Sequence, residues 1–470
     1  MSDFLDRLAA RRRFGMRPSL DAIRGVCAAL GDPQKKLRAI HVAGTNGKGA
    51  VCAMIDACLR SCGLRACRYT SPHLVRINER FFVDGKPVDD ATLESAADKV
   101  FHADSDTNSQ LTFFEALTAV AFIAFSETKC DYAVFETGLG GRLDATNICV
   151  PEICVITKIG LDHCDWLGDT VEKIAAEKAG IIKKGVPIVL GKNDPEVIAV
   201  VKARASEVGA PFFYAPDMAD ESEIPDGFSL EGAFNRENAV TALAVLKVLS
   251  QLESSKGLLG QTLCDTTQTL NDPKQTLSDT MLKGLCNVVW PGRFQRIGRF
   301  IIDGAHNPPA ARALAAALSK YAPFAGSVPT LIAGFCGDKD VGEVLSILAP
   351  LVTRGFAVKT NNPRSLSAEE TAAKMRAAGI DAVACPSLKE AIRMASPAPS
   401  AQHRIPRAMR AASAVARGVR RSRASTSGGA AQAPLTLICG SLFLAGEALA
   451  ELGAFPWQAD RFDAAEILKV

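Results

Sequence analysis

The 470-residue sequence lacks an uninterrupted apolar stretch of the length that a transmembrane helix needs. Its first residues contain no apolar run, so a secretory signal is not expected. The 14 cysteines show no repeated metal-binding spacing, and many lie in apolar runs, which is typical of buried free thiols in a reducing compartment. We therefore expect a cytoplasmic protein that does not span a membrane.

Positive and negative charges are unevenly distributed along the chain. The formal net charge is +3, yet residues 397–434 contain seven arginines and no acidic residue. Removing those seven charges leaves a net charge of −4, so the basic pI does not indicate a nucleic-acid partner. The segment is rich in Arg, Ala, Ser and Pro, which predicts a disordered insertion. A basic arm for RNA or a membrane surface is the alternative, but the segment lacks the interleaved aromatic residues of such arms.

The length of the chain is too great for one ordinary hydrophobic core and suggests two or three domains. Apolar strand patterns alternate with helical patterns, which predicts an α/β fold with parallel sheets. A new block of this alternation begins near Trp290. We predict a P-loop-type, mostly parallel sheet domain at residues 1–288, followed by a smaller Rossmann-like α/β domain at residues 289–470.

A glycine-rich turn at residues 44–49 joins a predicted strand to a predicted helix. Glycines allow backbone N–H groups to face an anion, the helix N-terminus adds positive potential, and Lys48 supplies a mobile cation. The strict P-loop pattern is not met, because Val42 replaces its first glycine and Gly49 its final Ser or Thr. The pattern thus indicates either a phosphate-binding loop or a tight strand-to-helix turn.

Three further polar residues, Ser71, Glu136 and His163, each follow a predicted strand. Because ligand groups collect at the carboxyl ends of parallel strands, we expect them to converge with Lys48 on one edge of the sheet. Glu136 is a candidate metal ligand, although a helix cap or an ion pair would explain it equally well. A histidine is an unusual ligand for Mg²⁺, which prefers oxygen, so His163 alone indicates packing more than metal binding.

Seven motifs, in this order, together resemble the folylpolyglutamate synthases and bifunctional dihydrofolate synthases of the Mur ligase superfamily. The resemblance covers residues 18–395 and 435–470. The motifs are His41-Val42-Ala43-Gly44-Thr45-Asn46-Gly47-Lys48-Gly49; Tyr69-Thr70-Ser71-Pro72-His73 with Asn78-Glu79-Arg80; Glu136-Thr137-Gly138-Leu139-Gly140-Gly141-Arg142-Leu143-Asp144-Ala145-Thr146-Asn147; Ile159-Gly160-Leu161-Asp162-His163; Glu177-Lys178-Ala179-Gly180-Ile181; Trp290-Pro291-Gly292-Arg293; and Asp303-Gly304-Ala305-His306-Asn307-Pro308.

The resemblance implies a role for each candidate residue. The residues implied to bind ATP are Gly44, Thr45, Asn46, Gly47, Lys48, Gly49, Asn238, Arg293 and Asp303. The implied magnesium ligands are Ser71, Glu136 and His163, and a carbamylated Lys178 would help to hold a second ion. Lys48, Lys178 and His306 are the implied catalytic residues, and Asp144, Arg80 and His306 the implied substrate contacts.

The resemblance also implies the reaction. ATP phosphorylates a substrate carboxylate, and the amine of L-glutamate then displaces phosphate from the acyl phosphate. The substrates would be dihydropteroate, folates or both, and the motif at residues 140–147 favours the bifunctional form. Two alternatives are a nucleotide-binding relative with lost turnover and a Mur-type cell-wall ligase. The second would need a further N-terminal domain, whereas only about 40 residues precede the loop. We expect a monomer with no specific nucleic-acid partner.

The chain departs from the family pattern at three places. Ala50 replaces a common serine, Lys158 replaces a small polar residue, and Phe234-Asn235 replaces His-Gln before Asn238. None of these changes removes an implied metal ligand. The missing hydroxyl at Ala50 predicts a reduced ATP affinity.

Overall fold

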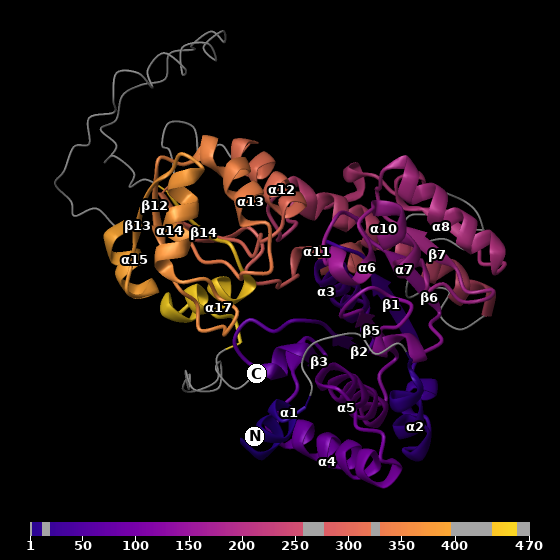
Figure 1. The fold of residues 1–470 in the computed structure, drawn as a ribbon. Helices are drawn as coiled ribbons and strands as arrows, with labels where there is room; N and C mark the ends of the chain where they lie inside the picture. Colours follow the sequence, from indigo (N-terminus) through magenta and orange to yellow (C-terminus); the bar gives the residue numbers. More distant parts are fainter. Residues whose placement is uncertain (1, 12–18, 257–276, 321–329, 396–434, 458–470) are drawn as a thin grey trace.

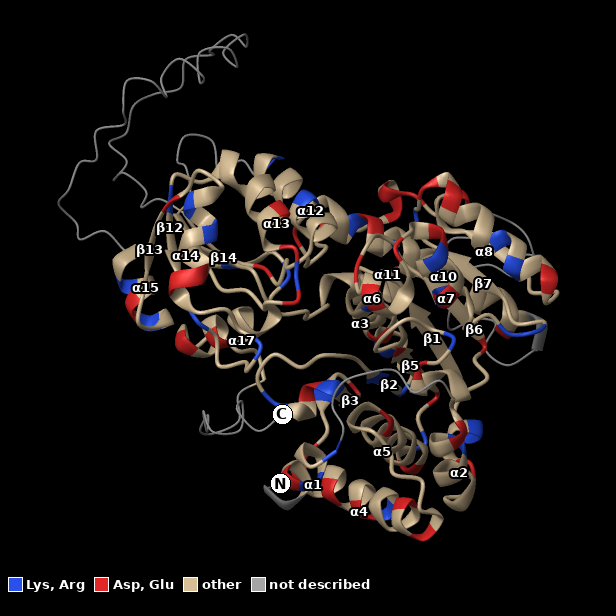
Figure 2. Ribbon diagram, in the orientation of Figure 1, with Lys and Arg blue, Asp and Glu red and all other residues tan. Residues whose placement is uncertain are grey.

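The computed structural model describes residues 2–11, 19–256, 277–320, 330–395 and 435–457, and the predicted Arg-rich insertion at 397–434 lies outside them. The described residues form two lobes, each built on its own sheet (Figure 1). In the view of Figure 2, acidic and basic residues are interspersed over both lobes. None of the helices in the described ranges combines the length and apolar character that a bilayer crossing requires.

The first sheet has eight strands in the order β4-β3-β2-β5-β1-β6-β7-β8. Strands β2, β5, β1, β6, β7 and β8 run parallel, and the β3–β4 hairpin adds an antiparallel edge. The central strands are buried on both faces, as their continuous apolar sequences require. Their bounds are β1 Ala39–Ala43, β2 Ala66–Tyr69, β3 Phe81–Val83, β4 Lys86–Pro87, β5 Tyr132–Glu136, β6 Ile153–Ile156, β7 Ile188–Leu190 and β8 Phe212–Tyr214.

Helices cover both faces of this sheet because alternate side chains of each strand point to opposite sides. Ile40 and Val42 of β1 pack with α3, α10 and α11, whereas Ala39 packs with α1, α2, α4 and α5 and Ala43 with α7 and α8. The helices are α1 Ser2–Ala9, α2 Asp21–Ala29, α3 Lys48–Ser61, α4 Asp90–Thr107, α5 Phe113–Thr128, α6 Cys164–Leu167, α7 Val171–Ala179, α8 Pro195–Glu207, α9 Ala215–Met218, α10 Ala233–Lys256 and α11 Asp279–Cys286, with short 3₁₀ helices at Pro33–Lys36, Ile77–Arg80, Ala145–Ile148 and Glu221–Glu223.

The second sheet has six strands in the order β13-β12-β11-β14-β10-β9, and only β9 is antiparallel. One face packs with α12, α13 and α14 and the other with α15 and α17. The bounds are β9 Gln295–Ile297, β10 Phe300–Ile302, α12 Pro308–Lys320, β11 Thr330–Ala333, α13 Val341–Leu348, 3₁₀ Ala349–Leu351, β12 Arg354–Ala357, α14 Ala368–Ala377, β13 Asp381–Ala384, α15 Leu388–Ala395, β14 Thr436–Cys439 and α17 Leu442–Glu451.

The predicted fold class is confirmed, since both lobes are α/β with mostly parallel sheets. The two sheets use residues 39–214 and 295–439, on either side of the predicted boundary at residue 288. The β3–β4 hairpin turns at Asp84-Gly85, with positive φ at both residues as a type I′ turn requires. The predictions from the sequence did not include α4, α8 or β13.

Candidate functional site

The glycine-rich loop lies between the end of β1 and the start of α3, and its glycines are required by close contacts. Gly44 has φ +149°, and a Cβ atom there would lie 1.9 Å from Thr157 Oγ1. Gly47 has φ +88°, and a Cβ atom there would lie 2.2 Å from Asn238 Oδ1. Any larger residue would therefore displace the loop or the start of α10.

Two amides of the loop are already paired within the protein. The backbone N–H groups of Thr45 and Asn46 both donate to the carbonyl oxygen of Lys158, at 3.0 and 3.1 Å. The Thr45 hydroxyl donates to Gly160 O at 3.1 Å. The amides of Thr45 and Asn46 are therefore not available to an anion. The first turn of α3 is the stronger candidate for anion binding.

The side chain of Lys48, the first residue of α3, extends toward the glycine-rich loop. Its Nζ donates to Gly44 O at 3.0 Å and to Thr45 O at 3.3 Å, and it lies 3.9 Å from Glu136 Oε1. The ammonium is therefore held between the loop and an acidic side chain. A phosphate bound at the helix start would lie within reach of this cation.

Glu136 ends β5 and is only 4% exposed. Its Oε2 accepts a hydrogen bond of 2.9 Å from the backbone N–H of Ser71, which follows β2. Burial raises the pKa of Glu136, while Lys48 and the Ser71 amide oppose that rise. The structure thus brings Lys48, Ser71 and Glu136 together at the edge that the strand order predicts.

His163 lies in the loop after β6, and its side chain is much more exposed than that of Glu136. Its side chain is 42% exposed, and Nε2 lies 3.9 Å from Asp162 Oδ1. Burial lowers the pKa of His163, Asp162 opposes this, and Lys339, Lys48 and Lys178 add to the lowering. Its imidazole therefore lies within electrostatic range of the glycine-rich loop.

A divalent cation fits the residue types here, because Glu136 is a buried carboxylate, the Ser71 whose amide it accepts from carries a hydroxyl, and Mg²⁺ prefers oxygen ligands. Among the residues that the structure describes, no three His, Cys, Asp or Glu side chains are gathered closely enough to hold a metal. An ion at Glu136 would thus depend on Ser71, on phosphate oxygens or on a movement of His163.

Lys178 on α7 is 4% exposed and points at the loop, where its Nζ donates to Gly44 O at 2.8 Å. Burial, and after it the nearby charge of Lys48, lower the pKa of this lysine to about 7. An amine with such a pKa is largely neutral above pH 7. Neutral amines react with carbon dioxide, so the environment suits the carbamylation that the resemblance implies.

Two of the implied substrate-contact residues, Asp144 and Arg80, differ in the hydrogen bonds that they already make within the protein. The carboxylate of Asp144 accepts from the amides of Gly138, Leu139 and Thr146, so it shapes the loop after β5. Arg80 is buried, and its Nε donates to His73 Nδ1 at 2.9 Å. The geometry thus gives Asp144 a clear structural role, and its contact with substrate stays a prediction.

The second lobe contributes a buried arginine, an acid and a histidine. Asp303 accepts from the amides of Phe294 and Ala305 at 2.7 and 2.8 Å, which fixes the turn after β10. Arg293 is electrostatically coupled to both Asp303 and Glu136. The Nδ1 atom of His306 lies 2.7 Å from Gly304 O, and burial, aided by Lys339, lowers the pKa of His306 to about 4.

Contacts between the lobes are the part of the site that sequence reasoning missed. Asp162 in the first lobe bonds to Asn307 and Lys339 in the second, at 2.9 and 3.0 Å. Trp290 lies against Gly49, where a Cβ atom would be 2.2 Å from Trp290 Cζ2. Lys339 lies between β11 and α13, and its place after an apolar strand is the one signal in the sequence for its position.

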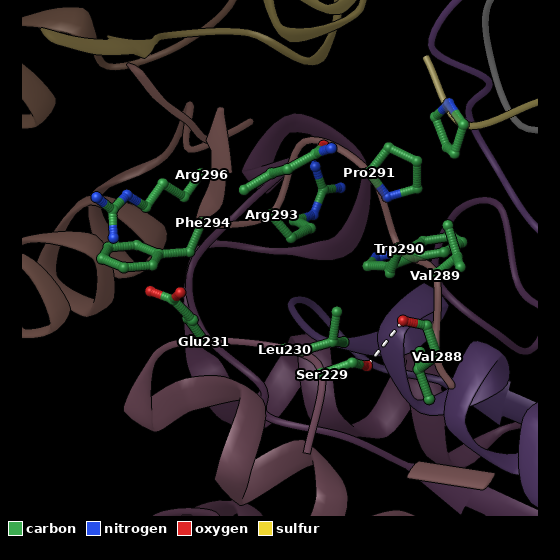
Figure 3. Close-up of a pocket in the computed structure, with 12 residues that line it drawn as sticks. Ser229, Leu230, Glu231, Val288, Val289, Trp290, Pro291, Arg293, Phe294 and Arg296 are labelled. Atoms are coloured by element: carbon green, nitrogen blue, oxygen red, sulfur yellow. Dashed lines mark hydrogen bonds between the residues drawn. The ribbon is translucent and has the colours of Figure 1, made fainter. Parts of the chain in front are cut away.

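A pocket of about 250 Å³ opens beside Trp290 and Arg293. Figure 3 shows Glu231, Phe294 and Arg296 at one end of it and Val288, Val289 and Trp290 at the other. Ser229 bonds to the carbonyl of Val288 across the base, at 2.8 Å. The full lining is Ser229, Leu230, Glu231, Val288, Val289, Trp290, Pro291, Arg293, Phe294, Gln295, Arg296 and Pro456.

The structure shows the surroundings of three residues that depart from the family pattern, Ala50, Lys158 and Phe234. Ala50 is 4% exposed and packs into the core under α3. The Lys158 ammonium pairs at the surface with Asp194, at 3.1 Å, so it does not enter the cluster. Phe234 packs edge-on against Phe294, with ring centroids 6.5 Å apart.

Comparison with known proteins agrees with this geometry. Residues 42–246 match the Mur ligase middle domain, and residues 292–403 match the Mur ligase glutamate ligase domain. The chain is 34% identical over 388 residues to a dihydrofolate synthase/folylpolyglutamate synthase of Bacillus subtilis, which covers 77% of this chain and 85% of that protein. It is also 34% identical over 396 residues to the protein of the same name from Mycobacterium tuberculosis, covering 76% and 77%.

Solved structures show the same similarity over nearly the whole chain. The folylpolyglutamate synthase of Mycobacterium tuberculosis complexed with ADP has a TM-score of 0.74 at 29% identity, covering 97% of this chain and 98% of that one. The bifunctional enzyme of Yersinia pestis complexed with AMPPNP and a manganese ion also has a TM-score of 0.74, at 27% identity, covering 96% and 98%. The chain therefore belongs to the folylpolyglutamate synthase and dihydrofolate synthase family of Mur ligases, which are ATP-dependent glutamate ligases.

Proposed function

We propose that this protein joins L-glutamate to both dihydropteroate and tetrahydrofolate, in two ATP-dependent reactions at one site. The observation that carries the proposal is the cluster of Lys48, Ser71 and Glu136 at one sheet edge, with Arg293 of the second lobe in electrostatic reach. The bifunctional names of the Bacillus subtilis and Yersinia pestis relatives support the two acceptors.

ATP would bind between the two lobes. The backbone amides of the first turn of α3, which have no partner within the helix, and the ammonium of Lys48 suit its phosphates, and Arg293 would reach them from the second lobe. Asn238 lies beside Gly47 and Asp303 stabilises the Arg293 turn, so both would bind or support the nucleoside side. The pocket lined by Glu231 and Phe294 continues from Arg293 and offers an aromatic face for a base.

Ser71, Glu136 and His163 would hold a magnesium ion beside the phosphates, with His163 moving toward Glu136. When bound, this ion would neutralise charge as phosphoryl transfer proceeds. A carbamylated Lys178 would replace a cation with an anion beside Gly44 and so help to hold a second ion. The pKa of Lys178, lowered to about 7 by burial, supports this modification.

The chain's own residues support both chemical steps. Lys48 would orient the terminal phosphate for attack by the acceptor carboxylate, which gives an acyl phosphate and ADP. The amine of L-glutamate then attacks the acyl carbon, and phosphate leaves. Because Nδ1 of His306 bonds to the carbonyl of Gly304, it carries the proton, and Nε2 keeps a lone pair at neutral pH. That lone pair would accept a proton from the glutamate nitrogen as the amine adds to the acyl carbon and phosphate leaves.

Arg80 and the loop held by Asp144 would form the pterin side of the cleft.

We also propose that the enzyme works as a monomer in the cytoplasm, in keeping with its reduced, mostly buried cysteines among the described residues. Sedimentation at micromolar concentration would test the monomer, since a stable dimer would double the apparent mass.

A phosphate-release assay with ATP, Mg²⁺ and L-glutamate tests the function, with dihydropteroate and tetrahydrofolate offered separately. We expect release with each acceptor and very little when glutamate is left out. The variant Glu136→Gln should bind the acceptor yet release almost no phosphate. Release with one acceptor only would remove the bifunctional claim, and release with neither would overturn the proposal.

A further inference from the structure

The loop after β6 in the first lobe is bonded directly to the second lobe through Asp162. Its Oδ1 accepts from Lys339 Nζ at 3.0 Å, and its Oδ2 accepts from Asn307 Nδ2 at 2.9 Å. The side chains of Asp162 and Lys339 are each only 12% exposed. A charged contact of this kind is stronger and less screened than a surface ion pair.

The two donors are themselves fixed by the helices of the second lobe. Asn307 Oδ1 accepts from the amide of Ala310 at 2.9 Å, so Asn307 caps α12 while its amide group reaches Asp162. Lys339 precedes Asp340, which caps α13 by accepting from the amide of Glu343. The position of Asp162 is therefore tied to the starts of two helices at once.

Asp162, which accepts both hydrogen bonds, is also bonded to the loop that carries His163. Asp162 Oδ1 also accepts from the backbone N–H of His163 at 2.9 Å. Two residues earlier, a Cβ atom at Gly160 would lie 3.1 Å from Pro309 Cγ, so the loop and the start of α12 are in close contact. The same loop bonds to Thr45 of the glycine-rich loop through Gly160.

We propose that Asp162, Asn307 and Lys339 form an interlobe clamp that positions the His163 loop only when the two lobes are docked. The role that we propose for this clamp rests on the proposed function. It couples phosphoryl transfer to the closed arrangement, in which an acyl phosphate is kept from water until glutamate attacks. Asp162 is thus a positioning residue, acting through His163 and the docking of the lobes.

The matched test exchanges the polar groups across the clamp. Asn307→Asp keeps a good helix cap for α12 but sets a second carboxylate against Asp162. The double variant Asp162→Asn with Asn307→Asp restores an amide–carboxylate pair with donor and acceptor reversed. Arg312→Met is the control, since Arg312 pairs with Glu343 across the same two helices, at the surface of the second lobe.

The first readout is the coupling ratio, the number of amide bonds formed per ATP hydrolysed. We expect Asn307→Asp to lower this ratio about tenfold, because water reaches the acyl phosphate, and the double variant to recover most of it. The control should match the wild type. A role that is only structural would instead lower the thermal midpoint of Asn307→Asp and leave the ratio unchanged, which would overturn the proposal.

The second readout does not require turnover. Small-angle scattering with AMPPNP and Mg²⁺ should give a larger radius of gyration for Asn307→Asp than for the wild type, the control or the double variant. Equal radii for Asn307→Asp and the wild type would also contradict the clamp. If the wild type forms no amide with either acceptor, the proposed function fails, while the scattering comparison still decides whether the clamp docks the lobes.

Discussion

Replacing Lys178 by methionine should make the unliganded protein more stable at neutral pH while it removes activity. Lys178 is 4% exposed and has no acidic hydrogen-bond partner within the described residues. Burial lowers its pKa from 10.5 to about 7. Between these two values the unfolded chain holds a proton that the folded chain releases, so the lysine opposes folding below pH 10.5, and most strongly below pH 7.

The magnitude follows from the pKa difference. Linkage gives an opposing free energy of about 4 kcal/mol at pH 7 and about 1 kcal/mol at pH 9.5. The hydrogen bond from Lys178 Nζ to Gly44 O, which methionine loses, contributes about 1 kcal/mol in the other direction. The free energy of unfolding of Lys178→Met should therefore exceed that of the wild type by about 3 kcal/mol at pH 7 and equal it near pH 9.5.

Urea unfolding in carbon-dioxide-free buffer at the two pH values measures this difference. Lys247→Met is the matched control, because Lys247 is equally buried but pairs with Glu223 at 2.7 Å. The control should lose stability at both pH values. Two results would refute the buried-charge account. One is a Lys178→Met variant that is less stable than the wild type at pH 7. The other is a stability difference between variant and wild type that is the same at pH 7 and pH 9.5.

Three further substitutions test the glycine-rich loop and the core. Gly49→Ala should weaken nucleotide binding at least tenfold by calorimetry, since its Cβ atom would lie 2.2 Å from Trp290 Cζ2; unchanged affinity would show that the loop is not the site. Gly25→Ala, whose Cβ atom meets only Ser109 Oγ at 3.5 Å, should raise the unfolding free energy by about 0.5–1 kcal/mol, and a loss would contradict the helical assignment of α2. Ala50→Ser should raise ATP affinity if a hydroxyl in the first turn of α3 reaches the phosphates, whereas equal affinity with lower stability would show that this side chain only packs in the core.

The convergence of Lys48, Ser71 and Glu136 could be predicted from the sequence because it follows from local patterns. Glu136 ends an apolar strand, Ser71 closely follows one and Lys48 begins the helix after one, and parallel strands place such positions on one edge. The helix α4 could also have been predicted. Asp89 is a good N-cap, and apolar residues follow at helical spacing from Leu93 to Phe101.

The contacts that depend on distant parts of the chain could not be predicted in this way. The Lys158 carbonyl that occupies two loop amides is a backbone group, so no side-chain pattern marks it. Asp162 and Lys339 are 177 residues apart, and their pairing depends on how the two lobes dock. Sequence periodicity describes which face of a helix or strand is buried, but it carries no signal for the relative placement of two separately folded sheets.

The transfer of oxygen from acceptor to phosphate tests the central claim most directly. The acceptor, dihydropteroate or tetrahydrofolate, is labelled with ¹⁸O in the carboxylate that accepts glutamate and is incubated with ATP, Mg²⁺ and L-glutamate. If the acceptor carboxylate is phosphorylated and glutamate then displaces phosphate, each amide bond formed leaves one labelled oxygen in the inorganic phosphate. Amide formation with unlabelled phosphate, or ATP hydrolysis without amide formation, would contradict the assignment of this chain as an acyl-phosphate-forming glutamate ligase.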